Sequence, residues 1–363
     1  MCSPCETGLA MASRPSLSTQ QLRAHVDRLP RYLLGHYPTP LEYCPRLTAQ
    51  LGGPRIYIKR DDCTGLAFGG NKTRHNEFLI ADALRKGADL LVWGAGVQSN
   101  NCRQTAAACA RAGLQIHLVL GRGGPAQGPD KIQGNLLLDY LVGAHVDIVE
   151  EMIGPELDAR ITHETEVHRT RGRRVYGWDK HICKPLAAVS YLLCVAEIVE
   201  QGTTQGFSPR AIYTSSAGST GAGVALARKA LGLDTAVHSV APIQWPYDTQ
   251  ADMAEIAQQA GLLVGLDLAM TPADIDVRFD CIGPGYGKLS DAGIEAIEML
   301  ARTEGILLDP MYSGKAMAGL IADVRAGRYR AGESVVLIHT GGTPALFAYA
   351  EGIVGKMHPR RLT

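Results

Sequence analysis

The sequence predicts an α/β protein in which helices cover parallel sheets. Short apolar runs typical of strands alternate along the chain with longer amphipathic runs typical of helices. Several of the helical runs end at a glycine that follows a basic residue, which is a common way for a helix to stop. Because strands separated by helices usually pair in parallel, this alternation indicates parallel sheets with helices packed on their faces.

The predicted elements follow one another from residue 76 to residue 339. We expect strands at 88–93, 115–120, 145–149, 211–213, 235–240 and 334–339. We expect helices at 76–85, 103–111, 133–141, 186–200 and 221–231. Gly87, Gly113 and Gly232 each follow the end of one of these helices, which supports the predicted boundaries.

Composition and charge limit the class of protein. The chain has 363 residues, of which 46% are hydrophobic and 20% are charged, as in an ordinary globular protein. This length allows two domains of roughly 100 to 200 residues each. Basic and acidic residues both number 36, so the formal net charge is zero and we expect neither a nucleic-acid nor a membrane partner.

Targeting and cysteine patterns point to the cytoplasm. No apolar run approaches the ~18 to 20 residues that span a bilayer, and the N-terminus lacks a continuous apolar signal segment. The nine cysteines are odd in number and scattered, which argues against a disulfide framework. Cys2 and Cys5 have the spacing of a redox or zinc half-site, but no second pair follows them. Residues 1–30 match no pattern, and we expect them to be disordered.

Lys72 follows two glycines, Gly69 and Gly70, and opens a helical pattern. A lysine at a helix N-terminus sits near the positive end of the helix dipole, which lowers its proton affinity and makes it a better nucleophile toward an aldehyde. The alternative is that the glycines form a turn and that Lys72 is simply solvated. The segment alone leaves both interpretations open.

Residues 215–223, a run of serine, glycine, alanine and threonine, lie between the predicted strand 211–213 and the helix that follows. Small residues let the backbone approach a ligand, and the N–H groups at a helix N-terminus favour an anion. The segment lacks the lysine of a nucleotide P-loop and departs from the dinucleotide fingerprint. It therefore predicts a phosphate site of another kind, with a tight strand-to-helix turn as the alternative.

Other candidate residues also follow predicted strands or lie among turn formers. Ser99 precedes the helix 103–111, where it either caps the helix or presents a hydroxyl to a ligand at the carboxyl end of the sheet. Tyr286 and Tyr312 lie in two loops rich in glycine and proline. Thr340 follows the last predicted strand.

Metal binding has little support in the sequence. His163 and His168, with Glu164 between them, superficially resemble a zinc-protease motif. The two histidines are five residues apart rather than four, so they cannot share one helical face in that manner. The eleven histidines otherwise show no ligand spacing, and we expect no metal.

Taken together, several segments match one family. They are residues 39–42, 58–65, 69–74, 98–100, 103–106, 218–220, Tyr286, 309–312 and 339–342. These segments resemble the pyridoxal-phosphate enzymes that include 1-aminocyclopropane-1-carboxylate deaminase, D-cysteine desulfhydrase and L-cysteate sulfo-lyase. The resemblance covers the chain from about residue 35 to residue 350.

The resemblance implies the fold type II architecture, similar to tryptophan synthase β, with two open, mostly parallel twisted sheets. Residues 1–72 and 183–363 would form a large cofactor-binding domain, and residues 73–182 a smaller inserted α/β domain. The cofactor would be pyridoxal 5′-phosphate, bound between the domains. The resemblance also implies a homodimer and a small amino acid as substrate.

The resemblance assigns roles to single residues. Lys72 would hold the cofactor covalently, the loop from Ser216 to Thr220 would bind its phosphate, and Asn100 would contact its 3′-oxygen. The residues implied in cofactor binding are Asn71, Lys72, His75, Asn100, Ser216, Ala217, Gly218, Ser219, Thr220, Ser313 and Thr340. Those implied in catalysis are Lys72, Ser99, Tyr286 and Tyr312.

Two positions help to choose a reaction. Ser313 would meet the pyridine nitrogen, as a hydroxyl residue does in the desulfhydrase-like members, whereas the deaminase has a glutamate there. A neutral partner weakens the electron sink and suits the loss of a good β-leaving group. Thr340, where the deaminase has leucine, points the same way. The resemblance thus implies a carbon–sulfur lyase that performs α,β-elimination on a β-substituted alanine such as cysteine or cysteate.

Some alternatives stay open. His75 stands where the family usually has lysine, and Asn101 where desulfhydrase-like members commonly have histidine, so another amino acid is a second candidate substrate. Ring-opening deamination is the minor alternative. An alternative from a different class is a protein that binds a cofactor or a dinucleotide without this catalysis. Such a protein would have no use for Lys72. The sequence does not fix the enantiomer or the leaving group.

Overall fold

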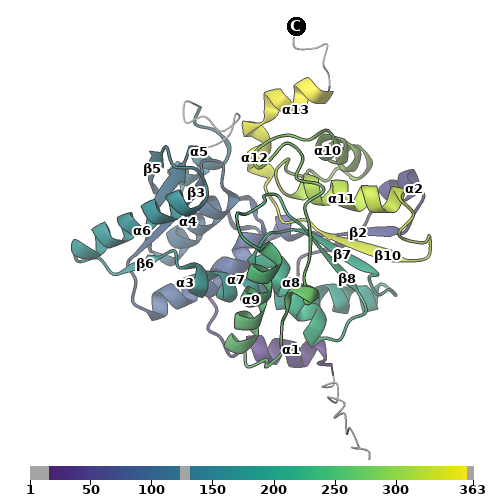
Figure 1. The fold of residues 1–363 in the computed structure, drawn as a ribbon, viewed down its shortest axis with the longest axis horizontal. Coiled ribbons are helices and arrows are strands. Elements are labelled where there is room, and N and C mark those ends of the chain that lie inside the picture. Colours follow the sequence, from purple (N-terminus) through teal and green to yellow (C-terminus); the bar gives the residue numbers. More distant parts are fainter. Residues whose placement is uncertain (1–15, 123–130, 358–363) are drawn as a thin grey trace, which may run out of the picture.

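The computed structural model describes residues 16–122 and 131–357. Within them the strands form two separate sheets (Figure 1). This arrangement confirms the predicted fold class of two open, mostly parallel sheets covered by helices. Cys2 and Cys5 lie outside the described residues.

The larger sheet combines two strands from the first 60 residues with four strands from the second half of the chain. Its order is β1-β2-β10-β7-β8-β9, and its only antiparallel pair joins β1 and β2. The strands are β1 (Leu41–Tyr43), β2 (Arg55–Lys59), β7 (Ala211–Ser215), β8 (Ala236–Val240), β9 (Asp276–Arg278) and β10 (Ser334–Ile338). Because β2 and β7 flank β10, residues far apart in the sequence share one sheet.

The smaller sheet is entirely parallel, in the order β5-β4-β3-β6. Its strands are β3 (Leu90–Gly96), β4 (Gln115–Gly121), β5 (His145–Val149) and β6 (Val175–Gly177). They come from one uninterrupted part of the chain. The domain boundaries at residues 73 and 182 stay a prediction.

Helices cover both faces of the larger sheet. Side chains on β10 alternate between two cores, with Val336 and Ile338 in one and Val335 and Leu337 in the other. In Figure 1, α7, α8 and α9 lie below this sheet and α10 and α11 above it. The helices around this sheet are α1 (Thr19–Val26), α2 (Pro45–Leu51), α7 (Lys180–Thr204), α8 (Ser219–Ala230), α9 (Thr249–Leu263), α10 (Asp291–Glu304), α11 (Ser313–Arg325), α12 (Thr343–Ala348) and α13 (Ala350–Met357).

Four helices pack around the smaller sheet. They are α3 (Asn71–Arg85), α4 (Asn100–Ala112), α5 (Gly134–Leu141) and α6 (Pro155–Thr170). Short 3₁₀ turns lie at η1 (Asp61–Cys63), η2 (Leu66–Phe68) and η3 (Pro272–Asp274). Leu157 and Ile161 of α6 pack on Val92 and Val119, so α6 covers one face of the sheet with its apolar stripe.

Three expectations from the sequence were wrong. Residues 16–30 are not disordered, because Ser18 and Gln21 form a capping box that starts α1. The helix expected at residues 76–85 begins at Asn71, since its first turn is polar and lacks apolar periodicity, whereas the position of Lys72 at a helix N-terminus is confirmed. The helix expected from residue 186 begins at Lys180, capped by Asp179, and contains Pro185.

Helix α7 is also long and apolar enough to cross a membrane, contrary to the expectation that no run approaches that length. Its apolar window is 83% buried inside the protein. Such burial on all sides is typical of the core helix of a globular protein. Val189, Leu192 and Val195 of α7 are 0% exposed and belong to the main hydrophobic core.

Candidate active site

A cavity of about 850 Å³ lies where loops from both sheets meet. Its walls come from segments that follow β3, β7, β8 and β10, and from α3 and α6. The predicted site residues that line it are Asn71, Lys72, Ser99, Asn100, Ser216, Ala217, Gly218, Ser219, Thr220, Tyr286, Tyr312 and Thr340. A crevice at the carboxyl ends of parallel strands is the usual ligand site of open α/β sheets.

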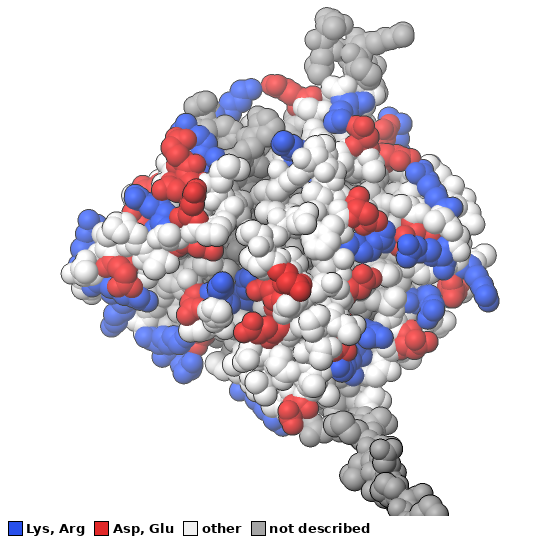
Figure 2. Space-filling view, viewed as in Figure 1, with Lys and Arg blue, Asp and Glu red and all other residues white. Residues whose placement is uncertain are grey.

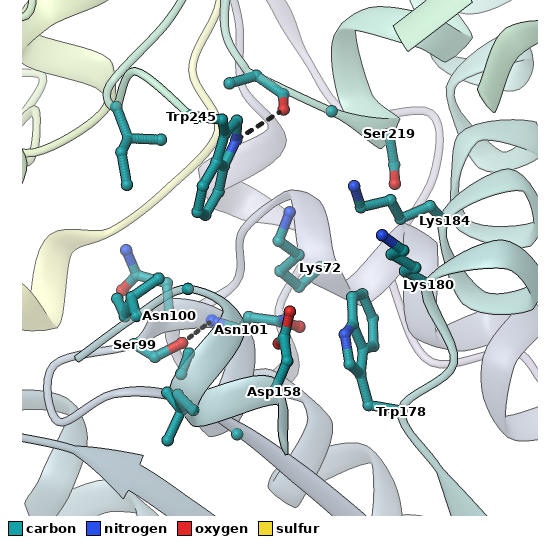
Figure 3. Close-up of a pocket in the computed structure, with 18 of the residues that line it drawn as sticks. Lys72, Ser99, Asn100, Asn101, Asp158, Trp178, Lys180, Lys184, Ser219 and Trp245 are labelled. Carbon is teal, nitrogen blue, oxygen red and sulfur yellow. Dashed lines mark hydrogen bonds between the residues drawn. The ribbon is translucent and has the colours of Figure 1, made fainter. Parts of the chain in front are cut away.

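Lys72 occupies the middle of this cavity. It is the second residue of α3, and its side chain extends into the open space between Trp178 and Trp245 (Figure 3). Burial lowers the pKa of Lys72 to about 8. A substantial fraction of its amine is therefore neutral near pH 8, and a neutral amine can attack an aldehyde.

Glycines place the start of α3 against the end of β10. Gly70 precedes the helix at φ +125°, and Gly341 has φ +89°. A Cβ on Gly341 would lie 2.6 Å from the Gly70 Cα, so the two loops approach more closely than side chains would allow. The Asn71 N–H donates to the Thr340 carbonyl at 3.0 Å and fixes this approach.

The loop between β7 and α8 presents backbone donors to the cavity. The Ser216 hydroxyl accepts from the N–H groups of Gly218 and Gly221 at 3.2 and 2.9 Å, which shapes the loop. Among the described residues, no acceptor satisfies the N–H groups of Ala217, Ser219 or Thr220. A Cβ on Gly218 would meet nothing within 4 Å, so open space lies beside these donors. Free N–H groups at a helix N-terminus form an anion site.

His75 lies behind this loop rather than in the cavity wall. It is 4% exposed, and burial, with Lys72 and Arg74 nearby, holds the pKa of its imidazole well below the ordinary value. Its Nε2 is 3.2 Å from the Thr220 hydroxyl, which also accepts from the Asn71 amide at 3.0 Å. His75 thus contacts Thr220 of the loop, and its expected contact with the cofactor stays a prediction.

Ser99 caps α4 and also lines the cavity. Its hydroxyl accepts from the N–H groups of Asn101 and Cys102, each at 3.1 Å (Figure 3). The Asn100 side-chain oxygen accepts from the Asn135 amide at 2.9 Å. Capping by Ser99 is therefore confirmed, and the contact of its hydroxyl with a ligand stays a prediction.

Tyr286 and Tyr312 form a hydroxyl pair in the cavity wall. Their oxygens are 2.7 Å apart and their rings meet edge to face at 6.3 Å. Burial raises the pKa of both phenols, so both are protonated at neutral pH. Since one hydroxyl donates to the other, the accepting tyrosine retains its own proton for a ligand.

Ser313 does not line the cavity. It is fully buried at the start of α11, and its hydroxyl donates to the Asp309 carboxylate at 2.6 Å. Asp309 also accepts from the N–H groups of Met311 and Tyr312 at 2.9 Å. Asp309 thus fixes the loop that presents Tyr312, and the contact of Ser313 with a pyridine nitrogen stays a prediction.

Several lining residues had no signal in the sequence. They are Asp158, Trp178, Lys180, Lys184, Trp245 and Tyr247. Trp245 donates to the Ala217 carbonyl at 3.3 Å and so braces the β7–α8 loop (Figure 3). Lys184 pairs with Asp252 at 3.0 Å. These residues reach the cavity through tertiary packing and belong to no local motif.

This combination fits a phosphorylated aldehyde cofactor. The free donors of residues 217, 219 and 220 suit a phosphate, and the Lys72 amine lies in the same cavity for covalent attachment. The fold and the site therefore define a lysine-dependent enzyme that binds such a cofactor between two α/β sheets.

Comparison with known proteins defines the family. The family model described as pyridoxal-phosphate dependent enzyme matches residues 32–341, and the chain belongs to this family. D-cysteine desulfhydrase of Salmonella typhi is 41% identical over 327 residues, which cover 90% of this chain and 98% of the relative. The enzyme of the same name from Salmonella newport strain SL254 is 40% identical over the same length.

Solved structures agree with this family. The crystal structure of an ACC deaminase homologue superposes with a TM-score of 0.83 at 30% identity, covering 92% of this chain and 98% of that one. Threonine deaminase isoform 2 of Solanum lycopersicum superposes with a TM-score of 0.62 at 20% identity and shows the fold alone. The resemblance found in the sequence is confirmed, and the protein is a pyridoxal-phosphate-dependent lyase.

Proposed function

We propose that the protein eliminates the β-substituent of a D-cysteine-like amino acid. For cysteine, water would complete the reaction to pyruvate, ammonia and hydrogen sulfide. The observation that carries the proposal is the placement of the Lys72 amine and the Tyr286–Tyr312 hydroxyl pair in one cavity. The high identity to enzymes named D-cysteine desulfhydrase, over almost their full length, supports this substrate class.

Different residues bind the cofactor and the substrate. The loop of residues 216–220 holds the phosphate of the cofactor through its free N–H groups, with Thr220 fixed by Asn71. The N-terminus of α4, with Ser99, would hold the carboxylate of the substrate, and Asn100 would contact the 3′-oxygen of the cofactor. Pyridoxal phosphate, when bound, supplies the electron sink for the electrons of the broken Cα–H bond.

The proton transfers fall to three side chains. The Lys72 amine, whose pKa is about 8, takes the proton from Cα of the substrate. The protonated Tyr286–Tyr312 pair lines the same cavity and donates a hydrogen bond to the leaving sulfur.

Ring-opening deamination is the competing reaction within this fold, since an ACC deaminase homologue superposes closely. The neutral Ser313 at the position expected to meet the pyridine nitrogen favours elimination of a good leaving group instead. An uncharged hydroxyl at that position would offer less stabilisation to a protonated ring than the glutamate of the deaminase would.

The test is to add D-cysteine, L-cysteine, L-cysteate and 1-aminocyclopropane-1-carboxylate separately to the purified holoenzyme. Sulfide, sulfite and individual keto acids are then measured. We expect pyruvate and sulfide from D-cysteine in preference to the other compounds. Release of 2-oxobutanoate from the cyclopropane with no pyruvate from D-cysteine would establish the competing reaction. Turnover of none of them would reject both.

We also propose that the protein is a cytoplasmic homodimer that binds neither nucleic acid nor membrane. Exposed apolar side chains gather on and beside α5 and α12, which contact each other; they are Ile132, Leu137, Tyr140, Leu141 and Phe347. Such a patch is typical of a protein interface. On the face in Figure 2, basic and acidic side chains are interspersed, as the zero net charge predicts.

A further inference from the structure

A cluster of three histidines and one aspartate lies on the smaller sheet, under the C-terminal part of α6. His117 comes from the middle of β4, and His145 lies opposite it on the edge strand β5. Asp147 is two residues after His145, so both side chains lie on the same face of the sheet. His168 of α6 lies against His117 from above the sheet.

The potential ligand atoms of this cluster converge. His117 Nε2 is 3.0 Å from Asp147 Oδ2, and His145 Nε2 is 3.7 Å from Asp147 Oδ1. One ligand atom of each of these three residues lies within 4.8 Å of the other two. An imidazole or carboxylate binds zinc at ~2.0 to 2.2 Å, so neighbouring ligand atoms of a tetrahedral site lie about 3.3 Å apart. The distances in the cluster therefore bracket those of a zinc site.

His168 gives the buried histidine a supporting partner. His117 Nδ1 is 2.9 Å from His168 Nε2, so the second ring nitrogen of His117 is engaged while its Nε2 faces Asp147. A metal-ligating histidine usually has such a partner on its other nitrogen, because that partner fixes the tautomer and the ring orientation. For an ion to bind Nε2, the neutral His117 must carry its single ring proton on Nδ1, where it donates to His168 Nε2.

The cluster is also accessible. His117 is 2% exposed, whereas the side chains of His145 and Asp147 are 68% and 44% exposed. An ion would thus be fixed by one buried and two accessible ligands, with room for water at the solvent side. Sites with three protein ligands and a water are a common zinc arrangement.

We propose that His117, His145 and Asp147 bind a divalent transition-metal ion of the zinc class, with His168 supporting His117. The ion replaces the contact between His117 Nε2 and Asp147, and His117 stays neutral with its one ring proton on Nδ1, donated to His168, through a shift of tautomer in the two histidines. The ion joins β4 to the edge strand β5, and His168 links it to α6, whose residues Asp158 and Glu166 line the active-site cavity. Occupancy stabilises this wall of the cavity and takes no part in the elimination.

The test uses tag-free holoenzyme that has been treated with a chelator and then dialysed against zinc ions alone. We expect one zinc ion per chain, a raised melting temperature, and an X-ray absorption spectrum with nitrogen and oxygen ligands only. His145→Ala and Asp147→Asn each should weaken binding at least about tenfold. His163→Ala, at an exposed histidine of α6 outside the cluster, is the matched control and should bind zinc as the unaltered protein does.

Three results would overturn the proposal. They are the absence of zinc binding by the unaltered protein, sulfur ligands in the absorption spectrum, and full binding by both the His145→Ala and Asp147→Asn proteins. Because His145 is exposed, its replacement leaves the core intact and the desulfhydrase activity of the variant serves as the folding control. The outcome is independent of the substrate that the enzyme accepts.

Discussion

Lys72 carries the chemistry of the site because of its surroundings. It projects from the first turn of α3 into a cavity that several buried loops enclose, and burial lowers its pKa from 10.5 to about 8. Only the neutral amine attacks the cofactor aldehyde. The neutral fraction of Lys72 therefore rises about tenfold per pH unit below pH 8 and levels off above it.

This pKa predicts the pH dependence of cofactor attachment. The rate at which the cofactor-free protein binds pyridoxal phosphate covalently should increase from pH 6 to about pH 8 and then stay constant. Stopped-flow visible absorbance measures this rate. A rate that keeps rising to pH 10 would show that Lys72 titrates as an ordinary solvated lysine.

The tyrosine pair predicts a second effect at single residues. Tyr286→Phe or Tyr312→Phe removes one of two hydroxyls that lie 2.7 Å apart in the cavity. Replacement of the tyrosine that assists the leaving group should lower kcat by roughly 10²- to 10⁴-fold, which is the usual range for loss of a general acid. Cofactor binding should be unchanged.

Steady-state kinetics with D-cysteine measure the change in kcat, and the visible spectrum shows whether the cofactor is still bound. Tyr43→Phe, at a partly exposed tyrosine of β1, is the matched control. Wild-type kcat in both the Tyr286→Phe and Tyr312→Phe proteins would exclude a role for the pair in the chemical step.

Much of the site was predictable from single residues. Lys72, Ser99 and residues 216–220 all follow strands or open helices, and such positions meet at one edge of parallel sheets. Trp178 and Trp245 were not predictable, since nothing in their local sequence indicates that tertiary packing brings them to the cavity. His75 and Ser313 occupy the expected segments, but their side chains are buried behind the wall.

At the scale of elements, a buried ion network holds α3 in place. The Arg74 guanidinium, two residues after Lys72, donates to both oxygens of Asp61 in η1 and both oxygens of Glu197 in α7 at 2.8 to 2.9 Å. Burial would raise the pKa of each carboxyl group, but Arg74 outweighs it and holds both pKa values below their ordinary range. The network thus ties the lysine-bearing helix to the centre of the larger core.

This network predicts a large stability change. Arg74→Met would leave two buried carboxylates without their main partner and should lower the free energy of unfolding by about 3 to 5 kcal/mol. Urea denaturation followed by circular dichroism measures this change. Arg23→Met breaks the half-exposed pair with Glu200 and, as the control, should cost about 1 kcal/mol or less. Equal losses of unfolding free energy in the two variants would contradict the role of the Arg74 network in stability.

Element boundaries show what periodicity misses. Apolar periodicity missed the first turn of α3, because residues 71–75 are polar side chains rather than part of an apolar stripe, and only the glycines before Lys72 indicated a helix start there. The histidine cluster was missed for a related reason. His117 and His145 are far apart in the sequence, and only the parallel pairing of β4 with β5 places them opposite each other.

At the scale of the whole molecule, the apolar patch on α5 and α12 bears on assembly. Leu141 and Phe347 are 70% and 65% exposed on helices that contact each other. If this patch is the dimer interface, the double variant Leu141→Glu/Phe347→Glu should shift the protein to a monomer. Light scattering after size-exclusion chromatography measures the mass. Leu262→Glu, on α9, is the control and should leave the mass unchanged, whereas an unaltered mass in the double variant would place the interface elsewhere.

The fold class followed from the alternation of strands and helices, but the division into two sheets did not. Alternation does not say which strands pair, and β10 pairs with both β2 and β7, although β2 lies more than half of the chain away from it. The division was expected only from the resemblance to known enzymes. Helix α7 also shows that a local pattern does not reveal tertiary packing. Its uniform apolarity reflects its place at the centre of the core.

The most direct test of the central claim is the visible absorbance of purified Lys72→Ala protein beside that of the unaltered protein, with keto-acid release from D-cysteine measured on the same samples. The account predicts that the unaltered protein shows the band of a lysine-bound cofactor and releases pyruvate. It predicts that Lys72→Ala loses both while it still binds pyridoxal phosphate noncovalently. An unchanged band together with full activity in Lys72→Ala would contradict it.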